Sequence, residues 1–178
     1  LLRELYDSTT DHMLGGDAPG ARIERANAVK EALRAELSDW TDAEFDDYVA
    51  RHFANYWLST DPDTRARHAR LVRQAGTNDA PLSLGTRVDQ FQAVTEVTLF
   101  ATDHPGLFAR IAGAMAVVGA SIVEAKIFTT TDGMALDTFW IQDTEHNAFD
   151  RPEKLARLSS VIEGTLSGGI KPREVLAD

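Results

Sequence analysis

Hydrophobic residues up to Gly76 recur at intervals of three and four, the spacing of helices that bury one face. The pattern predicts a first helix over residues 1–14, which Gly15 and Gly16 terminate. A second helix follows, and its predicted buried stripe consists of Ile23, Ala26, Val29, Leu33 and Leu37. The first part of the chain is therefore expected to be a helical segment.

Capping signals place two more helices in this segment. Thr41 and Glu44 have the spacing of a capping box, and Asp61 followed by Pro62 has the order of an N-cap and a first helical residue. We expect the helix after Asp61 to end before Gly76. The aromatic and apolar side chains between these caps are interpreted as helical core; they are Phe45, Tyr48, Val49, Phe53, Tyr56 and Trp57.

The predicted fourth helix is locally basic within an acidic chain. Its basic residues are Arg65, Arg67, His68, Arg70 and Arg73. Two interpretations stay open at this point. The cluster is either a solvated helix face or a surface that docks on an acidic part of a partner.

The hydrophobic pattern changes beyond residues 77–81, which are a run of turn-forming residues. We interpret this run as a linker. It would connect a helical segment at 1–76 to a domain at 82–178. The predicted elements of that domain are strands at 82–88 and 94–101, a helix at 106–118, strands at 121–131 and 134–143, and a helix from Pro152 to Gly168.

This order of elements predicts an α+β fold of the ferredoxin-like kind, in which two helices cover one face of an antiparallel sheet. A fourth strand should follow the last helix, but Pro172 interrupts the run there, so we expect that strand to be missing. The strand at 82–88 is our prediction for its place beside 94–101, with 89–93 as the connecting loop.

The dipeptide Asp132-Gly133 predicts a two-residue hairpin turn in which Thr131 pairs with Met134. This register would place on the helix-covered face Val123, Ala125, Ile127, Leu136, Thr138 and Trp140. It would leave on the open face Ile122, Phe128, Phe139 and Ile141. So much exposed apolar surface predicts self-association through the sheet, or cover by a second domain of a longer protein.

Composition narrows the classes of function. The chain has a net charge of −10 and a pI of about 4.9, which disfavours nucleic acid and anionic membranes as partners. It has no cysteine, in keeping with a cytoplasmic location. The chain begins at Leu1 within a predicted helix and without a signal peptide or an initiator Met, so we expect an excised piece of a larger protein.

Two sequence runs carry a family resemblance. The turn Asp103-His104-Pro105-Gly106-Leu107-Phe108 within a βαββα order resembles the ACT domain, a sensor of amino acids. The run AKIFTTTDGMALDTF at 125–139 resembles the first ACT domain of the PII uridylyltransferase family. Residues 1–6 resemble the stretch that follows the HD phosphohydrolase domain in that family, and residues 56–58 and 68–72 resemble its linker.

The resemblance implies a larger bifunctional enzyme. One of its domains would attach UMP to the nitrogen regulatory protein PII with Mg²⁺, an HD domain would remove it, and two ACT domains would report glutamine. The catalytic motifs of that family are missing here, so the resemblance implies no catalytic residue and no cofactor in this fragment. Two alternatives remain: an ACT domain that is a structural spacer without a ligand, or the ACT region of another HD-plus-ACT regulator, such as a guanosine tetraphosphate synthetase/hydrolase.

The candidate ligand site is the turn from Asp103 to Phe108. Backbone N–H groups at the start of the following helix could hold an α-carboxylate, and the Asp103 carboxylate could accept bonds from an α-ammonium. The predicted site residues are Asp103, His104, Gly106, Leu107, Phe108, Ala120, Ser121 and Ile122. A structural interpretation stays open, in which Asp103 only caps the helix, Pro105 and Gly106 only shape the turn, and His104 is merely exposed.

No metal site is predicted. The pair Asp11-His12 lacks companion histidines at ligand spacing and is interpreted as a solvated helix pair.

Overall fold

The structure, a computed structural model, describes residues 19–78 and 82–170. The predictions for the helix at 1–14, for Asp11-His12 and for the run around Pro172 lie outside these ranges. Contacts within the chain divide it into two compact units between Ala66 and Arg67. The first is a helical unit and the second is a sheet unit.

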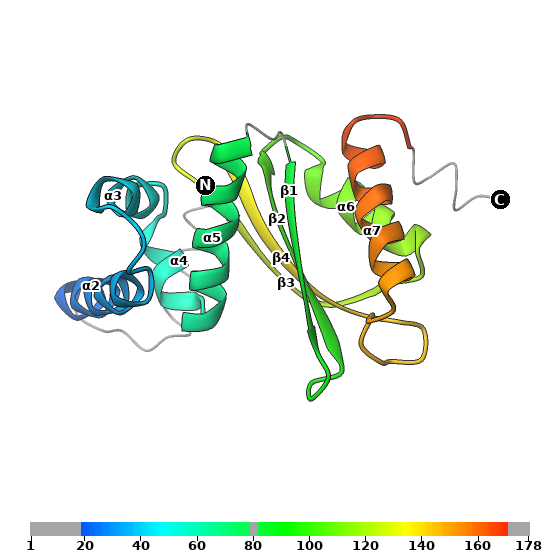
Figure 1. Ribbon diagram of the computed structural model, residues 1–178, viewed down its shortest axis with the longest axis horizontal. Coiled ribbons are helices and arrows are strands. Elements are labelled where there is room, and N and C mark those ends of the chain that lie inside the picture. The colour runs from blue at the N-terminus through cyan, green and yellow to red at the C-terminus, as the bar shows by residue number, and fades with distance from the viewer. Residues whose placement is uncertain (1–18, 79–81, 171–178) are drawn as a thin grey trace. The chain divides into compact units, whose positions relative to one another are not determined.

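The helical unit contains α2 (Pro19–Glu36), α3 (Asp42–Ala50), α4 (Ala54–Ser59) and the beginning of α5 (Pro62–Asn78), all labelled in Figure 1. Within α2 the predicted stripe is only partly correct. Ala26 and Leu33 are buried, as is Leu37 just beyond the helix, whereas Ile23 is 63% exposed. The short helix α4 was not predicted as a separate element.

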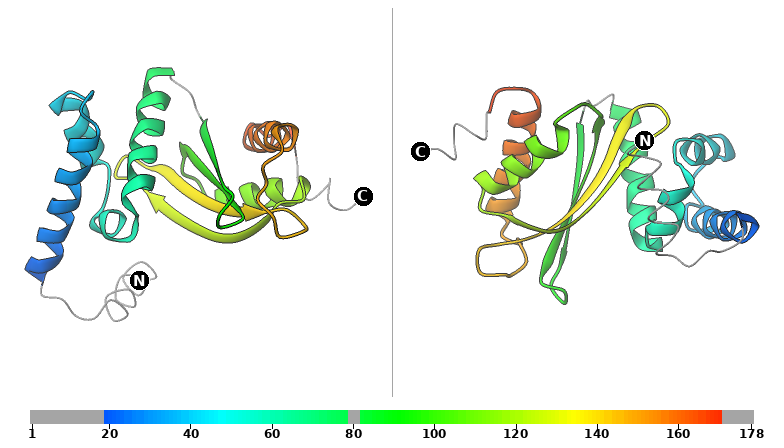
Figure 2. Two further views of the ribbon diagram at one scale, coloured as in Figure 1. Left: turned by 60° about the horizontal axis from the view of Figure 1, so that its bottom comes forward. Right: turned by 180° about the vertical axis from the view of Figure 1, so that it is seen from behind.

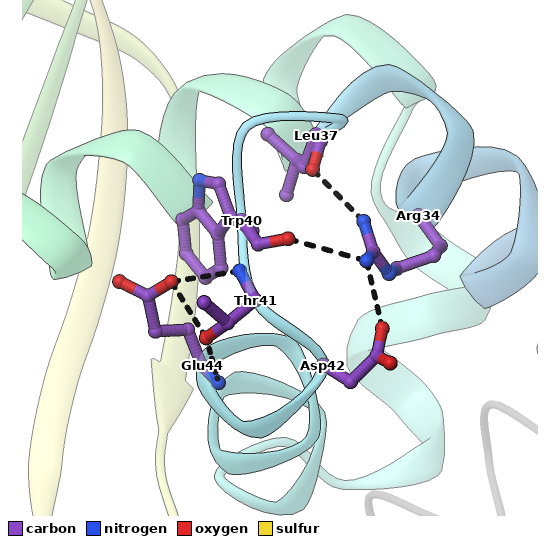
Figure 3. Close-up of polar contacts among 6 residues, drawn as sticks. All are labelled: Arg34, Leu37, Trp40, Thr41, Asp42 and Glu44. Atoms are coloured by element: carbon purple, nitrogen blue, oxygen red, sulfur yellow. Dashed lines mark hydrogen bonds and ion pairs between the residues drawn. The ribbon is translucent and has the colours of Figure 1, made fainter.

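The start of α3 shows the predicted capping box (Figure 3). The Glu44 backbone N–H donates to Thr41 Oγ1 at 3.3 Å, and the Thr41 backbone N–H donates to Glu44 Oε2 at 2.8 Å. Arg34 fixes the loop before this cap, because its guanidinium donates to the carbonyl oxygens of Leu37 and Trp40 and to the Asp42 carboxylate. The backbone N–H groups of Thr41 and Glu44 are thus satisfied locally.

Aromatic side chains fill the core of the helical unit, as predicted. The hydroxyls of Tyr48 and Tyr56 lie 2.7 Å apart, and the Trp57 ring packs edge-on against both tyrosines. Phe53 departs from the prediction, since it is 44% exposed where the chain passes from α3 to α4. Arg65 is buried, and its guanidinium donates to the carbonyl oxygens of Trp57 and Thr60.

The sheet unit confirms the predicted α+β fold. Its strands are β1 (Leu82–Asp89), β2 (Val94–Thr102), β3 (Ser121–Thr129) and β4 (Met134–Gln142), all antiparallel in the order β1-β2-β4-β3. Two further helices are α6 (Leu107–Val117) and α7 (Pro152–Leu166). Strand β1 pairs along β2 over its full length and takes the place predicted for it at the edge of the sheet.

Helices α6 and α7 lie side by side against one face of the sheet (Figure 1 and Figure 2). The fully buried side chains between the two layers include Leu99, Ile111, Met115, Phe139, Ile141, Leu158 and Ile162. Strands β2 and β4 contribute alternate residues to this core, as expected of a sheet with one face under helices. Among the described helices, none is both long and apolar enough to cross a membrane.

The predicted hairpin register is wrong by one residue. Thr129 pairs with Ala135, and the Thr130 N–H donates to the Met134 carbonyl, so the loop holds three residues rather than two. Gly133 adopts a left-handed φ of 79°, which is the conformation that three-residue hairpin loops require at that position. A shift of one residue turns every side chain of β4 to the other face.

This shift reverses the predicted faces of β4, while Ala125 of β3 stays on the helix side as predicted. Phe139 and Ile141, predicted to be exposed, are fully buried under α6 and α7, while Leu136 and Thr138 point to the opposite face. A register irregularity between Ile122 and Glu124 brings Ile122 back to the helix side. The prediction of self-association through an exposed Phe139 therefore has no basis in this fold.

The later turns of α5 cover the opposite face of the sheet. His68 is buried, and its Nε2 lies 2.8 Å from Thr138 Oγ1 of β4. Arg67 donates through Nε and Nη2 to both carboxylate oxygens of Glu96 on β2, at 2.9 and 2.7 Å. These two residues of the basic cluster are thus bound to the sheet instead of forming a solvated face. The division of the chain within α5 also differs from the linker predicted at 77–81, because α5 continues through Gly76 to Asn78.

Candidate functional site

The turn between β2 and α6 adopts the conformation that a binding turn needs. Gly106 is the N-cap of α6 with a left-handed φ of 86°, and no side chain of the described residues caps the first turn of the helix. A Cβ at Gly106 would meet nothing within 4 Å, so the requirement for glycine is conformational rather than steric. The Leu107 N–H donates to the His104 carbonyl oxygen at 3.1 Å, so the backbone N–H groups that could face a bound anion are those that follow Leu107 in the first turn of α6.

Asp103 is held beside this turn by the β3–β4 hairpin. Its backbone N–H donates to the Gly133 carbonyl at 3.0 Å, and its carboxylate accepts a bond from Thr129 Oγ1 at 2.9 Å. The alternative in which Asp103 caps α6 is therefore not what the structure shows. Its exposed carboxylate is instead positioned by the end of β3.

A second carboxylate, Asp137 on β4, is buried close to Asp103. The pKa of Asp137 is raised to about 7, chiefly by burial; a hydrogen bond from the Phe128 backbone N–H opposes this rise, and the nearby Asp103 charge adds a smaller increase. Its Oδ1 has no hydrogen-bond partner among the described residues. The sequence analysis missed this residue, because the predicted register placed Asp137 on the open face of the sheet, where an aspartate is ordinary.

The aromatic and apolar members of the turn differ in exposure. Leu107 is buried in the core, whereas Phe108 is 47% exposed and its ring centroid lies 5.7 Å from that of Phe139. His104 is half-buried, and its Nδ1 lies 3.2 Å from the carbonyl oxygen of Pro105. Phe108 thus presents an apolar surface at the edge of the turn.

The structure separates the remaining predicted site residues from this turn. Ser121 pairs with Gln142 at one end of the β3–β4 ladder, while Thr129 pairs with Ala135 at the end where Asp103 lies. Helix α6 connects the turn to Ala120, and residues 120–122 therefore lie at the far end of the sheet. Within one copy of the chain, Ala120, Ser121 and Ile122 do not adjoin Asp103, and Thr129 and Asp137 lie beside it instead.

The arrangement suits a zwitterion. Two carboxylates, one exposed and one buried with a raised pKa, favour an ammonium group near them, because a positive charge would relieve their mutual repulsion. The uncapped start of α6 favours a carboxylate. Among the described residues, no group of three or more His, Cys, Asp or Glu could hold a metal ion.

The fold and the turn together define a ferredoxin-like α+β domain preceded by a helical segment. Comparison with known proteins identifies the enzymes that this chain resembles. It is 50% identical over 97% of its length to the bifunctional uridylyltransferase/uridylyl-removing enzyme of Azospirillum brasilense. It is 41% identical over its full length to the enzyme of that name from Gluconobacter oxydans, and 42% identical over 99% of its length to that of Rhodospirillum rubrum.

These matches confirm the resemblance to the PII uridylyltransferase family that the sequence predicted. The chain spans only 18% or 19% of the length of these relatives, so it corresponds to one segment of such an enzyme. No protein-family model matches the chain.

Proposed function

We propose that this chain is a regulatory region of a bifunctional uridylyltransferase/uridylyl-removing enzyme, and that its sheet unit is an ACT-type domain that binds glutamine. The observation that carries the first part is the 50% identity over nearly the whole chain to an enzyme of that name. The alternative of a guanosine tetraphosphate enzyme loses its support, since the relatives described above all carry the uridylyltransferase name.

The turn from Asp103 to Phe108 supports the second part of the proposal. Asp103 would accept hydrogen bonds from the ligand ammonium, with the buried carboxyl of Asp137 behind it. The N–H groups that follow Leu107 in the first turn of α6 would bind the α-carboxylate, and the Phe108 side chain would contact the aliphatic part of the ligand. His104 and Leu107 would shape the turn around the bound molecule.

Regulation follows if glutamine binds one conformation of the parent enzyme better than another, because a ligand shifts an equilibrium only by its difference in affinity. In this proposal the parent attaches UMP to PII and removes it, and Mg²⁺ serves the transfer reaction elsewhere in the parent. No step of that chemistry is assigned to the described residues.

Calorimetric titration of glutamine into the chain tests the proposal. Asp103→Ala should weaken binding at least about tenfold, since a charge-assisted hydrogen bond is lost. Asp150→Ala is the matched control, because Asp150 is an exposed loop aspartate that accepts a bond from Gln90. Its affinity for glutamine should equal that of the unsubstituted chain.

The structural-spacer alternative makes the opposite prediction. If millimolar glutamine produces no binding heat with a folded chain, the domain is a spacer and the glutamine site lies elsewhere. Equal weakening by Asp103→Ala and Asp150→Ala would also contradict the assignment of the site.

A further inference from the structure

Asp137 of β4 occupies a core position next to the candidate site. Its side chain is only 1% exposed, and it pairs with Leu99 of β2 on one side and with Ile127 of β3 on the other. Thr129 lies two residues after Ile127, so its side chain is on the same face of β3, and its hydroxyl holds the Asp103 carboxylate at 2.9 Å. The buried and the exposed carboxyl groups are therefore neighbours near the β3–β4 hairpin.

The surroundings of Asp137 favour the protonated form of its side chain. Its Oδ1 has no hydrogen-bond partner among the described residues, and the Phe128 backbone N–H is the donor to the rest of the carboxyl. A buried carboxylate with too few hydrogen bonds, close to a second carboxylate, is less stable than the neutral acid. The pKa of about 7, raised chiefly by burial, agrees with this geometry. Near neutral pH the free chain is thus a mixture of the acid and the carboxylate.

Charged side chains of the surrounding elements have other partners. Lys126 of β3 is on the opposite face, where its ammonium lies 5.5 Å from the centroid of the Trp140 ring. Arg110 of α6 donates to carbonyl oxygens at the end of α7. Lys154 of α7 lies 4.0 Å from the carboxylate of Asp143, and the other charged residues of α7 are exposed.

Two more acidic groups near this part of the sheet are also engaged. Glu96 of β2 is bound by Arg67 on the face opposite to α6 and α7, and Asp132 of the β3–β4 loop accepts a bond from Thr130 Oγ1. Among the described residues, the charge that acts on Asp137 is that of Asp103.

We infer that binding of a ligand ammonium group beside Asp103 expels a proton from the Asp137 carboxyl, so that the affinity for the ligand rises with pH. This inference rests on the proposed glutamine site and adds a regulation by pH to it. Because the Asp103 charge reaches Asp137, an ammonium group bound to Asp103 acts on the same carboxyl with the opposite sign. The O–H bond of the acid breaks, the proton passes to water or buffer, and the remaining carboxylate attracts the ammonium.

The sign of this linkage distinguishes Asp137 from His104 of the turn. In acid the ligand has to displace a proton from Asp137, whereas above the folded pKa the carboxylate is already present, so affinity for glutamine should rise about fivefold from pH 5.5 to pH 7.5. A protonated imidazole at His104 would attract the ligand carboxylate in acid, and its titration would therefore lower the affinity as pH rises.

Calorimetric titration of glutamine into the whole chain at pH 7, in PIPES and in imidazole buffer, measures the released proton. Binding should be more exothermic in imidazole, because imidazole takes up the proton with a larger release of heat than PIPES. In Asp137→Asn the heats in the two buffers should be equal, and the rise of affinity with pH should be lost. Asp150→Asn, at an exposed loop position, is the matched control and should behave like the unsubstituted chain.

The carboxyl carbon shift of Asp137 in the unsubstituted chain provides a readout that does not depend on the variant folding. Its titration midpoint should fall when glutamine saturates the chain. Equal heats in the two buffers, an unmoved midpoint, or a buffer difference that persists in folded Asp137→Asn would overturn this inference alone, since glutamine would still bind. Absence of glutamine binding throughout the pH range would overturn the proposed function together with it.

Discussion

At the scale of single residues, two carboxylates determine the chemistry of the candidate site. Asp103 is exposed and anchored to Thr129, whereas Asp137 is buried beside it, and its Oδ1 accepts no hydrogen bond from the described residues. Burying a carboxylate without full hydrogen bonding disfavours its charged form, and a neighbouring carboxylate adds to that effect. Burial and repulsion between the two carboxylates therefore destabilise the unliganded site, and a bound ammonium group would reduce this destabilisation.

The raised pKa of Asp137 predicts how stability depends on pH. The pKa is about 7 in the folded chain, against an ordinary aspartate value of 3.8 that we take for the unfolded chain, so the folded state binds the proton more tightly. The stabilisation is complete below the unfolded pKa and is lost as pH rises through the folded pKa. The free energy of unfolding should hence fall between about pH 4 and pH 7 on account of this group.

The Asp137→Asn variant removes this titration while keeping the shape of the side chain. Its free energy of unfolding should exceed that of the unsubstituted chain by about 1–3 kcal/mol at alkaline pH, with the difference vanishing in acid. Urea unfolding across the pH range measures the difference. The same pH dependence with and without the substitution would contradict the assigned pKa.

At the scale of elements, the β3–β4 hairpin determines which face of the sheet is buried. The Asp132-Gly133 dipeptide predicted a turn correctly but not its length, because Gly133 serves both two-residue and three-residue loops. Only the packing of Phe139 and Ile141 under α6 and α7 distinguishes the two registers. The location of the elements could thus be predicted from local patterns, whereas the burial of β4 depended on contacts distant in the sequence.

Two glycine substitutions test this loop. Gly133→Ala should destabilise the chain by about 1 kcal/mol or more, because Gly133 has a left-handed φ of 79°. Gly76→Ala is the matched control within helix α5, where a Cβ meets nothing within 4 Å, and it should stabilise by about 0.5–1 kcal/mol. Chemical denaturation measures both; effects of the same sign would argue against the left-handed conformation of Gly133.

The packing of α5 against the sheet could not be predicted from local sequence patterns, for a similar reason. Arg67 and His68 are typical of a solvated helix face, and their partners Glu96 and Thr138 lie 29 and 70 residues away. The candidate site shows the same limit. The turn residues were visible as a motif, but Asp137 and Thr129 join it only through strand pairing.

The Arg67–Glu96 pair should contribute strongly to this attachment. Arg67→Met leaves Glu96, only 6% exposed, without its bidentate partner, and should cost about 2–4 kcal/mol of unfolding free energy. The double variant Arg67→Met/Glu96→Met should recover most of that loss, since no buried charge remains at the pair. If the double variant is as unstable as the single one, the pair acts through packing instead of charge.

At the scale of the whole molecule, α5 belongs to both units, because the contacts divide the chain between Ala66 and Arg67 within this helix. A fragment that starts at Asp61 should fold cooperatively, since it retains the bond from the Thr64 N–H to the Asp61 carboxylate and all of α5. A fragment that starts at Leu82 loses the helix that binds Glu96 and Thr138. Its sheet should be less stable and prone to association.

Circular dichroism and light scattering of the two fragments measure this difference. Equal stability and a monomeric mass for both would support the boundary predicted at 77–81 and contradict the role given to α5.

The central claim is that glutamine binds at the turn between β2 and α6, and amide chemical-shift mapping during a glutamine titration tests it most directly. We predict saturable shifts at Asp103, at the first residues of α6 and at Thr129, with the amides of Ala120 to Ile122 unchanged. Shifts that are absent at millimolar glutamine, or that cluster away from this turn, would contradict the claim.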